Sequence, residues 1–126
     1  MNRLDDIIAR LQALRHAPEP EDHSDSETIG SWRDRIDLID RILLALLNER
    51  SRSANAIGHV KQRLGLPIYV PEREKEVLSN VLEGNKGPLG DEAVRRLFER
   101  IIDETRSLER RRYQHKPNSK DGPSTE

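Results

Sequence analysis

The chain has 126 residues, of which 36% are charged and 3% are aromatic, and it contains no cysteine. This length suits one domain, and the abundance of Leu, Ile, Arg and Glu favours an all-α fold. The formal net charge of −1 gives no overall attraction to nucleic acid or to an anionic membrane, so neither is expected as a partner. Without cysteine there is no disulfide or thiol chemistry. The sequence shows no signal-peptide pattern and no run as long as a membrane span, so a cytoplasmic protein is expected.

The first predicted element is a short amphipathic helix over residues 1–15. Asp5 and Asp6 lie in its first turn, where the helix dipole favours negative charge. Its apolar residues fall on one face: Leu4, Ile7, Ile8, Leu11 and Leu14. So short a helix is marginal alone in water, so it would pack on the main body or on another protein. An acidic, proline-containing linker, expected to be flexible, follows over residues 16–30.

One long helix is predicted from Trp32 to Leu64, with Ser31 as its N-cap. Spacings of three and four place its apolar residues on one seam: Ile29, Trp32, Ile36, Ile39, Leu43, Leu46, Ile57, Val60 and Leu64. At about 1.5 Å per residue, this helix would be roughly 50 Å long. It exceeds the width of a small domain, so it must lie against something besides its own chain, and a second copy is plausible.

Two cations interrupt this seam. Arg50 stands where the heptad counted from Ile36 calls for Leu or Ile, and Lys61 follows eleven residues later on nearly the same face. Inward cations are costly unless anionic groups meet them. They could snorkel to water or pair with carboxylates of the chain. Alternatively, they form an anion site between packed helices, and periodicity leaves both interpretations open.

A shorter helix is predicted after the turn at Leu66-Pro67. Pro71 suits its first helical position. Its inward apolar residues are Val77, Leu78, Val81 and Leu82. Glu74 shares this face and Arg73 flanks it, although both could belong to a solvated run of charges in the first turn.

The last helix is predicted from about residue 88 to residue 113. Its buried stripe consists of Val94, Leu97, Phe98, Ile101, Ile102 and Leu108. Thr105 and Glu109 lie on the same stripe, seven and eleven residues beyond Phe98. Glu109 is therefore an anionic counterpart for the inward cations, either as a structural ion pair or as part of a binding site.

Four segments occur in a recognisable order and spacing: RDRIDLIDRILLALLNER, IGHVKQRLGLPIY, PEREKEVL and GPL…RLFERIIDETRSLE. They resemble the all-helical (type II) class of chorismate mutase, an isomerase of phenylalanine and tyrosine biosynthesis. We therefore assign residues 31–113 to a helical chorismate mutase domain and residues 114–126 to a disordered tail. The implied reaction is the intramolecular Claisen rearrangement of chorismate, a dicarboxylate, to prephenate. The resemblance implies no cofactor and no metal ion.

The resemblance also implies a three-helix protomer with one very long helix, and an intertwined homodimer with two equivalent sites. Spacing requires a second chain independently. Arg33 and Lys61 are 28 positions apart, about 42 Å along a helix, so Arg33 must come from the neighbouring subunit if both bind one small substrate. The additional N-terminal helix lies outside the family core and could recruit a partner enzyme.

The family roles carry over to the long and last helices as follows. Arg33 of the neighbouring subunit and Arg50 would pair with the two substrate carboxylates. Lys61 would donate to the ether oxygen and to a carboxylate. Glu109 stands where the family has Gln or Glu and would donate to the ether oxygen, which requires its protonated form.

Four further substrate contacts are implied. Arg73 and Glu74 would hold the ring region, with Glu74 accepting from the ring hydroxyl. Thr105 would support carboxylate binding. Val70 stands where many family members have Asp, but the family uses mainly the backbone at this position.

Two alternative functions are compatible with this pattern. An isochorismate-pyruvate lyase uses a similar scaffold and pocket and would release salicylate; the R-E-x-E-V-L turn and Glu109 favour the mutase. A non-catalytic helical interaction module would tolerate leucine at Arg50, Lys61 and Glu109 without loss of folding or dimerisation.

Overall fold

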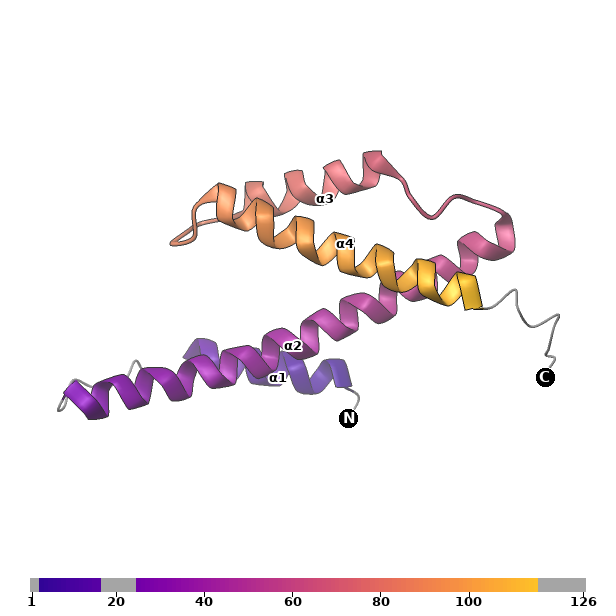
Figure 1. Ribbon diagram of the computed structural model, residues 1–126. Helices are drawn as coiled ribbons and strands as arrows, with labels where there is room; N and C mark the ends of the chain where they lie inside the picture. Colours follow the sequence, from indigo (N-terminus) through magenta and orange to yellow (C-terminus); the bar gives the residue numbers. More distant parts are fainter. Residues whose placement is uncertain (1–2, 17–24, 116–126) are drawn as a thin grey trace. The chain divides into compact units, whose positions relative to one another are not determined.

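The computed structural model describes residues 3–16 and 25–115, and these residues form four helices (Figure 1). They are α1 (Arg3–His16), α2 (Asp25–Leu64), α3 (Pro71–Gly84) and α4 (Asp91–His115). No strand occurs in the described ranges, which confirms the all-α prediction. Within the same ranges, no helix combines the length and apolar character needed to span a bilayer. Residues 17–24 of the predicted linker and residues 116–126 of the predicted tail lie outside the description.

The long helix α2 begins at Asp25, six residues before the predicted N-cap Ser31. Residues 25–30 are therefore helical, although their composition suggested a linker. The physical reason is the position of the acidic residues: Asp25 and Glu27 occupy the first turn, where negative charge interacts favourably with the helix N-terminus. With 40 residues, α2 is about 60 Å long.

The chain forms two compact units, Met1–Ser53 and Ala54–Glu126, and α2 contributes to both. In the N-terminal unit, the buried residues are Ile7 on α1 and Ile42 on α2, each 3% exposed. A helix without a neighbour cannot bury one of its own side chains to this extent. Ile7 and Ile42 are therefore each covered by residues outside their own helix.

The seam of α2 is exposed in the single chain. All nine of its residues, from Ile29 to Leu64, are between 36% and 65% exposed. So many exposed large apolar side chains on one helix, on either side of Arg50, are unusual for a monomeric protein. The prediction that α2 lies against something besides its own chain is consistent with this exposure.

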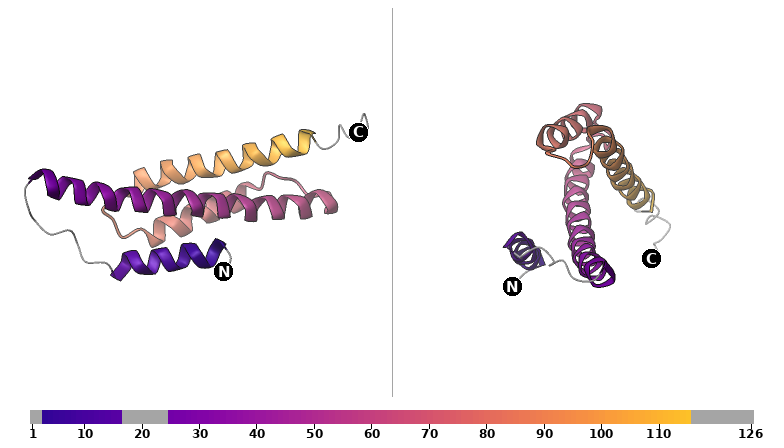
Figure 2. Two further views of the ribbon diagram at one scale, coloured as in Figure 1. Left: turned by 90° about the horizontal axis from the view of Figure 1, so that it is seen from below. Right: turned by 90° about the vertical axis from the view of Figure 1, so that its left-hand side faces the viewer.

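In the C-terminal unit, α3 and α4 pack together as a helical hairpin, visible in Figures 1 and 2. Val94 and Ile102 are the buried residues of α4. The side chain of Asn85 closes the connecting loop, because its amide donates to the carbonyl of Leu89 (2.9 Å) and to the carboxylate of Asp91 (2.8 Å). The facing residues of α3 are half-buried: Val77, Leu78, Val81 and Leu82.

Ile102→Ala is expected to lower the free energy of unfolding by about 2–4 kcal/mol, because it removes buried methyl groups and leaves a cavity beside α3. Denaturant titration at one fixed protein concentration measures this change. The matched control is Glu99→Ala on an exposed position of α4, which should change stability by less than about 0.5 kcal/mol. Equal effects of the two substitutions would show that Ile102 is not part of the core.

Candidate active site

The end of α2 places Lys61. Gly65 adopts a φ of 71°, which glycine tolerates best. The N–H groups of Gly65 and Leu66 donate to the carbonyls of Gln62 (3.3 Å) and Lys61 (2.8 Å), which is a Schellman motif. The chain then turns so that Nζ of Lys61 donates to the carbonyl of Ile68 at 3.2 Å. The ammonium group of this half-buried lysine is thereby held by the segment that follows the helix.

Glu109 on α4 lies close enough to Lys61 for the charge of the lysine to act on its carboxyl group. Burial raises the pKa of Glu109 above its ordinary value, while the nearby positive charge of Lys61 opposes the rise. The net shift is upward, so desolvation outweighs the attraction. The structure thus brings Lys61 of α2 and Glu109 of α4 close together. The spacing of apolar residues had predicted that each of them lies on the inward face of its own helix.

The start of α3 places Glu74. Val70 is the N-cap, and its carbonyl accepts from the N–H groups of Arg73 (3.0 Å) and Glu74 (3.3 Å). The side chain of Val70 makes no capping hydrogen bond. Pro71 occupies the first turn, where its missing N–H costs nothing. The backbone therefore holds Glu74 in the first turn of the helix without help from the side chain at position 70.

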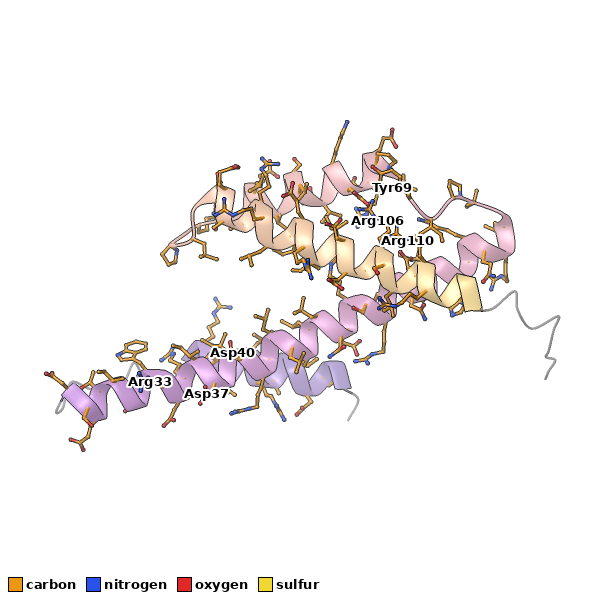
Figure 3. The ribbon with its side chains drawn as sticks, in the orientation of Figure 1. Arg33, Asp37, Asp40, Tyr69, Arg106 and Arg110 are labelled. Atoms are coloured by element: carbon orange, nitrogen blue, oxygen red, sulfur yellow. The ribbon has the colours of Figure 1, made fainter. Side chains whose placement is uncertain are left out.

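Glu74 forms an ion pair with Arg106 of α4, a residue that the sequence had not marked. Nη1 of Arg106 lies 2.8 Å from Oε2 of Glu74, and the guanidinium carbon lies 4.7 Å from the centroid of the Tyr69 ring. Figure 3 shows Tyr69 and Arg106 together where α3 faces α4. Arginine is frequent in this part of the chain, so composition does not single out Arg106. The signal in the sequence that could have identified Arg106 is its position directly after Thr105, which lies on the inward stripe of α4.

The other predicted residues of the C-terminal unit have local partners. The hydroxyl of Thr105 donates to the carbonyl of Ile101 one turn earlier, at 2.9 Å. Arg73 is exposed and pairs with Glu76 on its own helix. Thr105 therefore stays on the inward stripe of α4, whereas Arg73 lies on the solvent side of α3.

Arg33 and Arg50 belong to the N-terminal unit. Arg50 is half-buried and Arg33 is exposed. Figure 3 shows Arg33 on the first half of α2, followed on the same helix by Asp37 and Asp40. In the described part of the chain, no three histidine, aspartate or glutamate side chains are grouped so that they could hold a metal ion.

The fold resembles that of solved chorismate mutases. The form II structure of chorismate mutase from Thermus thermophilus superposes with a TM-score of 0.65 and 41% sequence identity, covering 66% of this chain and 94% of that one. The form I structure from the same organism gives a TM-score of 0.60 and 40% identity over 61% of this chain and 96% of that one.

Sequence relatives agree. A bifunctional chorismate mutase/prephenate dehydratase from Neisseria gonorrhoeae is 47% identical over 84 residues, which are 67% of this chain but 23% of the relative. The chain thus spans about a quarter of such bifunctional relatives. A chorismate mutase from Methanocaldococcus jannaschii is 30% identical over 93 residues, which are 73% of this chain and 94% of the relative. The family model for chorismate mutase type II matches residues 32–110. The chain therefore belongs to the chorismate mutase type II family.

Proposed function

We propose that the chain catalyses the rearrangement of chorismate to prephenate. The observation that carries this proposal is the position of Lys61, close enough for its charge to act on Glu109, a carboxyl group whose pKa is raised by burial, in a member of the chorismate mutase type II family. In the rearrangement, the ether carbon–oxygen bond breaks while a carbon–carbon bond forms within the same molecule. The electron shift is internal, so the enzyme needs no nucleophile.

Lys61 and Glu109 would stabilise the transition state. As the carbon–oxygen bond lengthens, negative charge grows on the ether oxygen. A lysine ammonium group and a protonated carboxyl group can both donate hydrogen bonds to that oxygen. Because the ammonium group of Lys61 is already held by the Ile68 carbonyl, this donor would not need to reorganise during the reaction.

Arg50 and Arg33 would fold the flexible substrate into a reactive shape. Chorismate carries two carboxylates, and guanidinium groups bind carboxylates through two parallel hydrogen bonds. Gripping both carboxylates holds the enolpyruvyl arm over the ring and removes an entropic barrier. Thr105 would support one of the carboxylates from α4.

The ring end of the substrate would lie at the start of α3. Glu74 would accept a hydrogen bond from the ring hydroxyl, and Arg73 would contact the same region. For Arg73 this requires exchange of its exposed pair with Glu76, which costs little because surface ion pairs are weak. Val70 would contribute through its backbone.

We further propose that two copies form an intertwined homodimer and that each site receives Arg33 from the neighbouring subunit. The exposed seam of α2 supports this arrangement, because a second α2 would cover it. The three-helix protomer would then consist of α2, α3 and α4. Helix α1 ends before the family match begins at residue 32, and we assign it as an addition to the catalytic domain.

The proposed function is tested by incubating the purified chain with chorismate and, separately, with isochorismate. Prephenate from chorismate would support the mutase, whereas salicylate and pyruvate from isochorismate would identify a lyase. A bicyclic dicarboxylate that mimics the transition state should raise Tm by mass action. A chain that leaves both substrates unchanged and gains no stability from the mimic would contradict a catalytic role.

Glu109 gives the proposed mutase a specific pH dependence. Its carboxyl group donates a hydrogen bond only when it is protonated. Because its pKa is raised, the carboxyl group stays protonated at pH values above the ordinary glutamate pKa of about 4.3. It loses the proton, and with it the hydrogen bond, as the pH rises through the shifted pKa. We therefore expect kcat/KM, which reports the pKa of the free enzyme, to fall as the pH rises above the ordinary glutamate pKa. Glu109→Gln keeps a donor at every pH and should remove this fall. Identical pH profiles of the two proteins would refute the donor role.

A further inference from the structure

Arg106 connects α3 to α4 at Glu74. Its Nη1 donates to Oε2 of Glu74 at 2.8 Å, although the two residues are 32 positions apart. Its Nη2 donates to Oδ1 of Asp103, on the same helix, at 2.8 Å. Arg106 and Glu74 are 23% and 28% exposed. One planar guanidinium group therefore binds two carboxylates from different helices in a partly desolvated position.

Tyr69 lies against the face of this guanidinium group. The guanidinium carbon lies 4.7 Å from the ring centroid, within the range of a cation–π interaction. Figure 3 shows the tyrosine beside Arg106. The Asp103 bond at one end and the ring against its face both favour one orientation of the guanidinium plane. The direction in which Nη1 meets Glu74 is therefore set before any ligand arrives.

The contact with Arg106 leaves Glu74 able to bind a ligand. The recorded bond uses Oε2, and each carboxylate oxygen has two acceptor positions, so Oε1 can still accept a hydrogen bond. A glutamate side chain that is already oriented loses less rotamer entropy when a ligand binds. The hydrogen bond from Arg106 to Oε2 of Glu74 thus orients the carboxylate so that Oε1 can accept a hydrogen bond from a ligand hydroxyl group.

We propose that Arg106 is a positioning residue: it orients Glu74 toward the ring hydroxyl of the substrate and thereby makes the enzyme prefer a ring that carries this hydroxyl. The inference rests on the proposed function. Arg106 acts through Glu74 and does not itself touch the substrate. Because the ring hydroxyl takes no part in bond making or breaking, its contact should matter about equally for the substrate and the transition state. Loss of Arg106 should then appear mainly in KM.

The test compares Arg106→Met with the unmodified protein on two substrates: chorismate and an analogue that keeps the allyl vinyl ether but lacks the ring hydroxyl. For chorismate, kcat/KM should fall by about 10- to 100-fold, chiefly through KM, as expected for a misplaced contact. For the analogue, kcat/KM should change by less than about threefold. Arg106→Lys should recover only part of the loss, because an ammonium group lacks the planar fork.

Two further proteins make the test specific. In a Glu74→Gln background, Arg106→Met should add little to the loss, because residues that act as one unit are not additive. Arg100→Met, which removes an exposed arginine paired with Glu104 on α4, should leave both substrates unaffected. Equal losses on both substrates would overturn the inference and assign Arg106 a scaffold role; no loss would overturn it as well. An unmodified protein that leaves chorismate unchanged would instead refute the proposed function.

Discussion

Lys61→Met is expected to lower kcat by about 10²- to 10³-fold, the loss typical of removing one donor to a developing negative charge. Lys61 is held by the Schellman turn at the end of α2 and by the Ile68 carbonyl. Methionine has the same length as the four-atom apolar stem of lysine but lacks the terminal ammonium group, so it supplies neither the charge nor the hydrogen bond. Steady-state assays with chorismate measure the effect, and kcat should fall more than KM rises, because the charge exists mainly in the transition state.

Lys75→Met is the matched control for Lys61. Lys75 is an exposed lysine on α3, so its replacement should leave kcat and KM within about twofold of the unmodified protein. Melting curves of both variants separate a chemical loss from a folding defect. A folded Lys61→Met protein with normal kcat would remove Lys61 from the mechanism and, with it, the ether-oxygen role.

Arg33→Ala and Lys61→Met should each be nearly inactive alone, yet co-expression of the two variants should restore about a quarter of the unmodified activity. In a symmetric dimer whose sites take Arg33 from one subunit and Lys61 from the other, each mixed dimer has one site with both residues intact. Random pairing makes about half of the dimers mixed, and half of their sites are intact. Activity per site, measured on the whole mixture of dimers purified through a tag that both chains carry, checks this value.

The control for complementation is co-expression of Lys61→Met with Arg50→Leu. In the proposed site both residues come from the same subunit, so every site of a mixed dimer carries one defect and activity should stay low. Restoration in this control, or none with Arg33→Ala, would contradict the proposed sharing of sites between subunits. A monomeric protein in sedimentation experiments would contradict it too, since Arg33 could then not reach Lys61 of another chain.

Local sequence patterns were enough to predict much of this protein. The helical period of about 3.6 residues placed Lys61 and Glu109 on inward faces, and the structure shows that the charge of one acts on the other. The Leu66-Pro67 turn and Pro71 marked the start of α3 for steric reasons that do not depend on the rest of the chain. These features are local because helix faces and helix ends are decided within a few residues.

Where local signals conflicted, the sequence interpretation was less accurate. The acidic segment before Ser31 was assigned to the linker by composition, but Asp25 and Glu27 stabilise a helix that starts there. The same residue types are common in flexible linkers and in first turns of helices. Whether such a segment is a linker or a helix start depends on the turns that follow it. Once those turns are helical, the segment can extend the helix without a new nucleation step.

The sequence alone determined the helices, their apolar faces, and the charged residues that interrupt those faces, because each depends on spacing along one chain segment. Tertiary structure alone decided that Arg106 meets Glu74 across 32 residues while Tyr69 covers its guanidinium group. The reason is that the register and angle of α3 on α4 are set by side-chain packing between helices. This packing depends on the surfaces of α3 and α4 together, so it cannot be predicted from either helix sequence alone.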